Sequence, residues 1–260
     1  MNLGLADKVA LITGGSEGVG KGIALCLAAE GAKVAICARR EGVLEAAAAE
    51  VREASGAEVL AVAADVSDAG QIERLVAATA ERFGRIDILV NNAGRSFAKP
   101  FEELSDADWD DDLSLKFSAA VRCSRGVIPH MRQIGGGRII NITHPGGKAP
   151  GAGSLPTSVS RAAGIALTKA MSKDLAGDNI LVNTVCLNSI KSAQTERYWR
   201  NSGAEGSLEE FERRAGQRLP VGRLGEPEEV GALVAFLASR HAGFITGTAV
   251  NIDGGASAVI

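Results

Sequence analysis

The sequence is poor in cysteine, and no two of its cysteines lie close together in the chain. Cys26, Cys37, Cys123 and Cys186 are scattered, and no CxxC pair occurs. Zinc sites and disulfide frameworks need cysteines at short spacings, so we expect neither, and we expect no bound metal. Isolated cysteines are typical of small buried residues in a reducing compartment, which predicts a cytoplasmic protein.

Long apolar runs, a basic leader and clusters of positive charge are also missing. No stretch approaches the roughly 18 apolar residues of a membrane span. The opening MNLGLADKVALITGG lacks the basic and apolar regions of a signal peptide. The net charge is −3, and no group of lysines and arginines stands out. We therefore expect no nucleic-acid or membrane partner, and a small-molecule substrate instead.

Short apolar, β-branched runs alternate along the chain with segments of helical periodicity. Strands are predicted at Val9–Thr13, Lys33–Cys37, Val59–Ala63, Ile86–Val90, Arg138–Ile142, Ile180–Val185 and Thr248–Ile252. Helices are predicted at Gly20–Glu30, Glu41–Ala54, Ala69–Phe83, Ser105–Met131, about Ser158–Ala176 and Pro227–Leu237. This alternation predicts a single α/β domain over residues 1–260, in which helices cover both faces of a seven-stranded parallel sheet.

Residues 191–218 form the least regular part of the chain. They combine Ser, Gly, Glu and Arg with the only tyrosine, Tyr198, and its neighbour Trp199. Long irregular segments often carry function, so we expect a flap over a ligand, and a plain surface excursion is the alternative.

A glycine-rich turn lies between the first predicted strand and the first predicted helix. Its sequence, TGGSEGVG, includes Gly14, Ser16, Gly18, Val19 and Gly20. Glycines let the backbone turn tightly and approach a pyrophosphate, and the helix N-terminus offers free N–H groups. The alternative is a turn without a ligand. The nucleoside-triphosphate loop GxxxxGK(S/T) is excluded, because a glycine follows the lysine.

Two arginines end the second predicted strand. An acidic residue at this place binds the ribose 2′-hydroxyl of NAD, whereas Arg39 and Arg40 suit the 2′-phosphate of NADP. The pattern therefore favours NADP over NAD as the cofactor, with NAD and solvated surface arginines as the alternatives.

With these features, the chain resembles the short-chain dehydrogenases/reductases over its full length. The matching segments are TGGSEGVG at 13–20, Asp65-Val66, Asn91-Asn92-Ala93-Gly94, Arg138–Ile142, Arg223–Pro227, Ile245-Thr246-Gly247 and Asp253-Gly254-Gly255. The resemblance implies a doubly wound, Rossmann-like domain, bound NAD(P) and a homotetramer. It also implies that Asp65 and Val66 border the adenine, that Asn92 lies along the ribose, and that Ser192 contacts the nicotinamide carboxamide.

The active-site positions of the resemblance are replaced. The family uses Asn, Ser, Tyr and Lys, with the last two spaced YxxxK. Here the tyrosine position holds Thr157 and the lysine position Arg161. Counting along the chain places His144 at the serine position and Lys116 at the asparagine position. This predicts an atypical active site made of His144, Thr157, Arg161 and Lys116.

The replacements change which group can move a proton. A threonine hydroxyl does not ionise near neutral pH, and Arg161 stays charged, although it can still bind ribose hydroxyls or an anion. His144 has a suitable reference pKa of about 6.5, and Lys116 becomes suitable if it is buried beside Arg161. The alternatives are a histidine that only bonds its loop and a lysine on a helix surface. Tyr198 is expected to lie at the surface or in packing.

The first functional interpretation is an NADP(H)-linked oxidoreductase of carbonyl or hydroxyl compounds with a non-standard proton relay. Arg161, Lys116 and His144 together would form a cationic pocket, so the substrate is expected to be anionic. Two alternatives remain open: a non-redox enzyme such as a lyase or dehydratase, and a dinucleotide-binding protein without catalysis.

Overall fold

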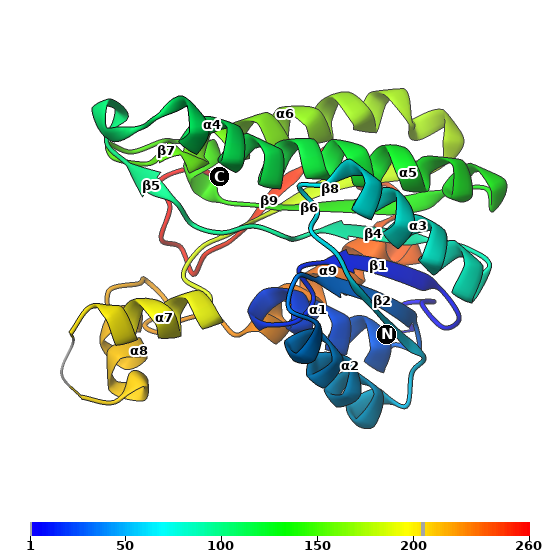
Figure 1. The fold of residues 1–260 in the computed structure, drawn as a ribbon, viewed down its shortest axis with the longest axis horizontal. Coiled ribbons are helices and arrows are strands. Elements are labelled where there is room, and N and C mark those ends of the chain that lie inside the picture. The colour runs from blue at the N-terminus through cyan, green and yellow to red at the C-terminus, as the bar shows by residue number, and fades with distance from the viewer. Residues whose placement is uncertain (1, 204–205) are drawn as a thin grey trace.

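The computed structural model describes residues 2–203 and 206–260 and contains the predicted parallel sheet. Its strand order is β3-β2-β1-β4-β6-β8-β9 (Figure 1). The strands are β1 Val9–Thr13, β2 Lys33–Ala38, β3 Val59–Ala63, β4 Ile88–Asn91, β6 Gly137–Thr143, β8 Ile180–Leu187 and β9 Ala249–Ile252. The order turns back on itself at β1, where β2 and β4 pair on either side. The predicted doubly wound, Rossmann-like α/β fold is confirmed.

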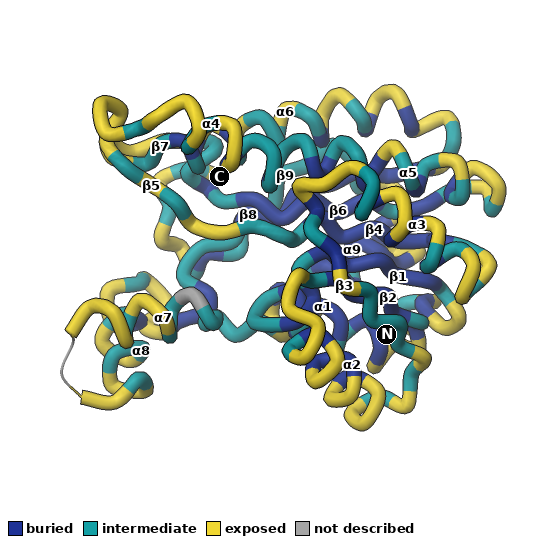
Figure 2. The backbone as a smooth tube through the Cα atoms, viewed as in Figure 1, coloured by how far each residue is buried: buried dark blue, intermediate teal, exposed yellow. Residues whose placement is uncertain are grey.

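Helices cover both faces of the sheet. The helices are α1 Gly18–Ala29, α2 Glu41–Ser55, α3 Ala69–Phe83, α4 Asp106–Leu113, α5 Ala119–Gln133, α6 Thr157–Asp174, α7 Ala193–Asn201, α8 Leu208–Gly216 and α9 Pro227–Ala238. In Figure 1, α1, α2 and α9 lie on one side of the strands, and α3, α5 and α6 lie on the other. Each side has its own hydrophobic core. Figure 2 shows that the central strands are the most buried part of the chain.

The predicted helix from Ser105 to Met131 is interrupted. A π-helical turn at Ser114–Ser118 separates α4 from α5. The start is as predicted, because Ser105 caps α4 and forms a capping box with Asp108. Turns of this kind are rare and widen the helix, and they concentrate at functional sites. This one carries Lys116.

The expectation of an irregular segment at 191–218 is wrong, because this segment contains α7 and α8. Ser192 caps α7, Ser207 caps α8, and the rings of Tyr198 and Phe211 lie 6.0 Å apart. Both helices are short and strongly polar, so few apolar residues mark their periodicity in the sequence. Figure 1 shows the pair standing apart from the sheet. Residues 204 and 205 of the predicted flap lie outside the described residues, and its movement stays a prediction.

A small two-stranded sheet was not predicted. Strand β5, Ala98–Lys99, pairs antiparallel with β7, Leu155–Pro156. This pairing joins the loop after β4 to the start of α6. It therefore fixes the position of Thr157, the first residue of α6. In the described part of the chain, no helix is long and apolar enough to span a membrane.

Candidate active site

A cavity of about 740 Å³ opens at the carboxyl ends of the central strands. Parallel α/β sheets bind ligands at this edge, beside the point where the strand order reverses. Its walls come from the glycine loop after β1, the loops after β4, β6 and β8, the first turns of α6, and residues 257–259. Thus segments far apart in the sequence meet around one space. Within the described ranges, no group of three His, Cys, Asp or Glu side chains could hold a metal ion.

The glycine loop has the shape that a dinucleotide pyrophosphate needs. Gly14 has a φ of +68°, and the side-chain amide of Asn92 donates to the carbonyl oxygens of Thr13 and Gly14. Glu17, at the N-cap of α1, makes no side-chain capping bond. Among the described residues, the first N–H groups of α1 therefore have no side-chain acceptor, and Gly18, Val19 and Gly20 line the cavity. The residues present fit the cofactor.

Substituting Gly20 tests this fit. A Cβ at Gly20 would lie 2.1 Å from the carbonyl oxygen of Gly14, so we expect Gly20→Ala to weaken NADPH binding. The free energy of unfolding should fall by about 1–3 kcal/mol, which is typical of overpacking. Gly42→Ala is the matched control, because nothing lies within 4 Å of its added Cβ, and it should stabilise α2 by about 0.5–1 kcal/mol. Unchanged NADPH affinity in Gly20→Ala would argue against the pyrophosphate site.

The adenine side of the predicted cofactor site is more open. Arg39 and Arg40 line a second hollow together with Ser16, next to the first cavity. Arg40 forms an ion pair with Glu17, and Nη1 of Arg39 lies 4.0 Å from a carboxylate oxygen of Asp65.

The resemblance assigns four more residues to the cofactor, and they differ in whether they line a hollow. These residues are Asp65, Val66, Asn92 and Ser192. Val66 is buried in the core, and neither Val66 nor Asp65 lines either of the two hollows. Ser192 and Asn92 both line the large cavity. The roles of these residues remain predictions.

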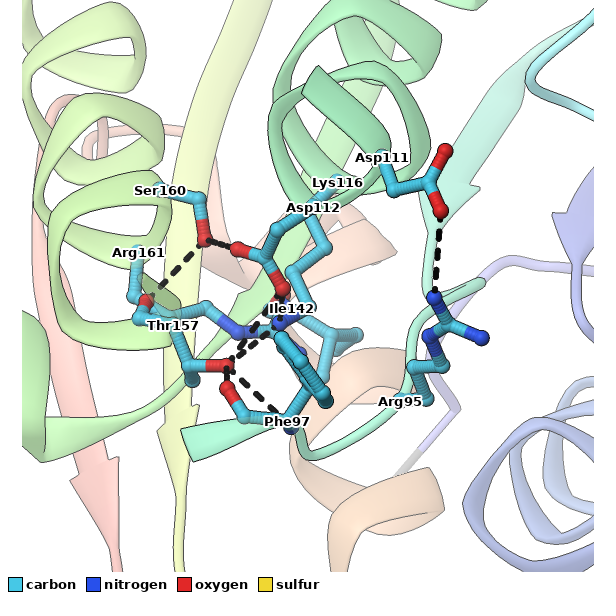
Figure 3. A network of polar contacts seen from close by, with 9 residues as sticks. All are labelled: Arg95, Phe97, Asp111, Asp112, Lys116, Ile142, Thr157, Ser160 and Arg161. Atoms are coloured by element: carbon cyan, nitrogen blue, oxygen red, sulfur yellow. Dashed lines mark hydrogen bonds and ion pairs between the residues drawn. The ribbon is translucent and has the colours of Figure 1, made fainter. Parts of the chain in front are cut away.

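Thr157 occupies the tyrosine position, but its hydroxyl is fully engaged. It donates to the carbonyl oxygen of Phe97 at 2.6 Å and accepts from the ammonium of Lys116 at 2.7 Å. It also accepts the N–H of Phe97 at 3.3 Å (Figure 3). The only proton of this hydroxyl is therefore used to hold the loop after β4. Thr157 lines the cavity as a positioning residue, and its geometry does not favour proton transfer.

Lys116 is buried, which excludes the alternative of a helix-surface lysine. Its ammonium contacts Asp112, one turn earlier, as well as Thr157. Burial and the nearby charge of Arg161 lower the pKa of Lys116 to about 8, against the opposing effect of Asp112. Lys116 does not line the cavity, although its Cγ lies just behind Gly94, which does.

Asp112 and Ser160 belong to this network and were missed by the sequence analysis. One carboxylate oxygen of Asp112 contacts Lys116, and the other accepts the hydroxyl of Ser160 at 2.6 Å (Figure 3). Both side chains are buried. The available signal was the spacing: Asp112 precedes Lys116 by four residues, which places the two on one side of a helix.

Arg161 lines the cavity at the lysine position. Its Nη1 donates to the carbonyl oxygen of Ile142 at 2.8 Å. Its Nε is buried and has no hydrogen-bond partner among the described residues. Its Nη2 lies against Gly94, since a Cβ added there would be 3.0 Å from it. No carboxylate of the described residues forms an ion pair with Arg161.

His144 also lines the cavity, immediately after β6. Its Nδ1 accepts the N–H of Gly146 at 2.8 Å at the start of a short 3₁₀ turn. The proton of the neutral ring is therefore on Nε2. Burial, together with the charge of Arg161, lowers the pKa of His144 below its usual value, and Asn188 and Asp253 oppose this. Burial and the charge of Arg161 both favour the neutral form of the imidazole ring.

Tyr198 is 67% exposed on α7 and lies at the second hollow. It packs on Phe211, as expected for a surface or packing role.

Known proteins are similar to this chain over nearly its whole length. The profile of the family described as enoyl-(acyl carrier protein) reductase matches residues 14–257. The 3-oxoacyl-(acyl-carrier-protein) reductase of Synechocystis sp. is 37% identical over 253 residues, which cover 96% of this chain and 97% of that protein. Two solved structures are also similar over nearly the whole chain.

The first is L-sorbose reductase of Gluconobacter frateurii, complexed with NADPH and L-sorbose. It has a TM-score of 0.94 and 32% identity, with full coverage of both chains. The second is a single-substitution variant of the actinorhodin polyketide ketoreductase with NADPH. It has a TM-score of 0.90 and 37% identity, and the match covers 97% of this chain and 98% of that one.

The fold and the cavity define an α/β protein of the dinucleotide-binding class. The chain belongs to the short-chain dehydrogenase/reductase family, as the sequence predicted. It is accordingly an NAD(P)-dependent oxidoreductase.

Proposed function

We propose that the protein is an NADPH-dependent reductase of carbonyl compounds in which His144, rather than a tyrosine, donates a hydrogen bond and then a proton to the carbonyl oxygen. The observation that carries this proposal is that His144 and the glycine loop line one cavity. The loop supports dinucleotide binding, and the neutral ring of His144 carries its proton on Nε2. Relatives that are named reductases, two of them in complexes with NADPH, support the same class of reaction.

In this proposal each part of the site has a separate role. The N–H groups at the start of α1 bind the pyrophosphate, and Arg39 and Arg40 bind the 2′-phosphate. When bound, NADPH supplies the hydride that the carbonyl carbon takes up. The carbonyl oxygen then takes the proton from Nε2 of His144, and the ring recovers a proton from water. A neutral imidazole can polarise a substrate carbonyl, and here burial and the charge of Arg161 keep the ring neutral.

The test measures binding and turnover separately. Purified protein is titrated with NADPH and NADH, followed by fluorescence and thermal shift, since a ligand of the folded state raises its stability. The NADPH-saturated protein is then mixed with a panel of aldehydes and ketones, and the loss of reduced nicotinamide is followed. We expect the protein to bind NADPH, and we expect at least one class of carbonyl compound to oxidise the bound NADPH. Tight binding without oxidation by any of them would overturn the reductase and favour a dinucleotide-binding protein.

Removing the two arginines tests the choice of cofactor. We expect Arg39→Ser combined with Arg40→Ser to weaken NADPH binding by about 10- to 100-fold, because hydrogen bonds to a charged group are lost. NADH binding should stay the same, since NADH lacks the 2′-phosphate. Arg125→Ser, which removes an exposed arginine from α5, is the control and should change neither affinity. Equal weakening for both nucleotides would mean that the arginines do not recognise the 2′-phosphate.

A further inference from the structure

Arg161 brings a positive charge to the cavity that its surroundings do not neutralise. Nη1 of its guanidinium donates to the carbonyl oxygen of Ile142, and its buried Nε has no hydrogen-bond partner among the described residues. A neutral carbonyl satisfies a hydrogen bond but does not cancel a charge. A cation in a partly buried site is costly unless an anion accompanies it.

Among the described residues, the carboxylate whose charge acts on Arg161 is that of Asp112, and it already bonds two other groups. Asp112 gives one carboxylate oxygen to Lys116 and the other to the hydroxyl of Ser160. Its single negative charge therefore faces two cations, Lys116 and Arg161. The effect is visible in the pKa of Lys116, which the charge of Arg161 helps to lower. The network consequently lacks one negative charge on the side that faces the cavity.

The other charges around the cavity are also mainly positive. Arg95 and Arg197 line it, and Glu17 is the one side-chain carboxylate among the described lining residues. Glu17 is paired with Arg40, so it does not compensate Arg161. Arg95 is 3.8 Å from the exposed carboxylate of Asp111, an interaction that solvent weakens.

We propose that Arg161 binds a carboxylate of the substrate, so that this protein acts on oxo acids rather than on neutral carbonyl compounds. A ribose hydroxyl can accept a bond from Arg161 but brings no charge, so cofactor contacts alone leave the guanidinium uncompensated. A planar guanidinium matches a carboxylate in two parallel hydrogen bonds. The predicted pocket of three cations is reduced, because Lys116 forms an ion pair with Asp112 and does not line the cavity. The proposal rests on the proposed function, since it places the substrate beside the dinucleotide.

The experiment compares acids with their uncharged counterparts. Pyruvate, acetoacetate and levulinate, which differ in the distance from carbonyl to carboxylate, are each paired with their methyl ester. With NADPH saturating, we expect kcat/KM for one acid to exceed that of its ester by about 10- to 100-fold, in line with a hydrogen-bonded charge. Binding of the same compounds is measured in parallel by thermal shift, with and without NADP⁺, where no reduction can occur.

Variants assign the discrimination to Arg161. Arg161→Gln should abolish the preference for the acid, Arg161→Lys should keep part of it, and Arg74→Gln, an exposed arginine of α3, should leave it unchanged. The NADPH affinity of each variant is measured to separate cofactor effects. If acid and ester are reduced and bound equally well, the proposal of a carboxylate site is overturned, but the proposal that the protein is a reductase still stands. Selective acid binding that depends on Arg161, without turnover, would support the contact between Arg161 and a carboxylate and would count against the reductase.

Discussion

We expect His144→Ala to lower kcat for carbonyl reduction by about 100- to 1,000-fold, the usual cost of removing one donor to a developing oxyanion. The reason is geometric. The bond from the N–H of Gly146 to Nδ1 fixes the ring and leaves Nε2–H as the donor at the cavity wall. Thr157, at the usual tyrosine position, has its proton committed to Phe97 and is not free to take over.

Steady-state kinetics with the best carbonyl substrate measure the effect. The affinity for NADPH should stay unchanged in His144→Ala. The glycine loop follows β1, and β4 lies between β1 and β6, the strand that precedes His144. His144→Gln, whose amide retains an N–H donor, should keep more activity than His144→Ala. His130→Ala removes a histidine of α5 that does not line the cavity, and it serves as the control. A full rate in His144→Ala would rule out this donor.

The pH dependence separates His144 from Lys116. The folded pKa of His144 lies below 6.5, so the ring is neutral at neutral pH. Protonation requires Nδ1 to give up its bond from Gly146, so we expect the reduction rate to be level near neutrality and to fall as the pH drops through this pKa. A rate that instead changes around pH 8 would point to Lys116, whose pKa is lowered to about 8.

The sequence predicted the sheet and the glycine loop because both depend on local signals. Buried parallel strands appear as apolar runs, and a strand, a glycine turn and a helix follow one another within 22 residues, from Val9 to Glu30. His144, Thr157, Arg161 and Lys116 were found by their spacing within a family pattern. The structure brings Lys116 and Thr157 into direct contact and places His144, Thr157 and Arg161 around one cavity.

The contacts that decide what these residues can do were outside the reach of the sequence. The hydroxyl of Thr157 bonds a backbone group 60 residues away, and this depends on the pairing of β5 with β7. Each of these strands is only two residues long, too short to produce a periodic pattern. Asp112 is one of a run of acidic residues, Asp110 to Asp112, and only the fold shows that it is the buried one.

Asp112→Ala should lower the free energy of unfolding by about 3–5 kcal/mol, the range observed when one partner of a buried ion pair is removed. The carboxylate of Asp112 is the only one that the described ion pairs bring to Lys116, and it also accepts from Ser160. Without it, two cations remain close together in a partly dry site, and the hydroxyl of Ser160 loses an acceptor. Denaturant unfolding at fixed protein concentration measures the change.

Asp111→Ala is the matched control, because Asp111 is the preceding residue and its side chain is 74% exposed. Solvent screens its interaction with Arg95, so the expected change is within about 0.5 kcal/mol. The double variant Asp112→Leu with Lys116→Leu removes both charges together and should lose less stability than Asp112→Ala alone. A loss below about 1 kcal/mol in Asp112→Ala would contradict a buried, charged pair. The argument that the charge of Asp112 is taken up by Lys116, and is therefore not available to neutralise Arg161, would then lose its support.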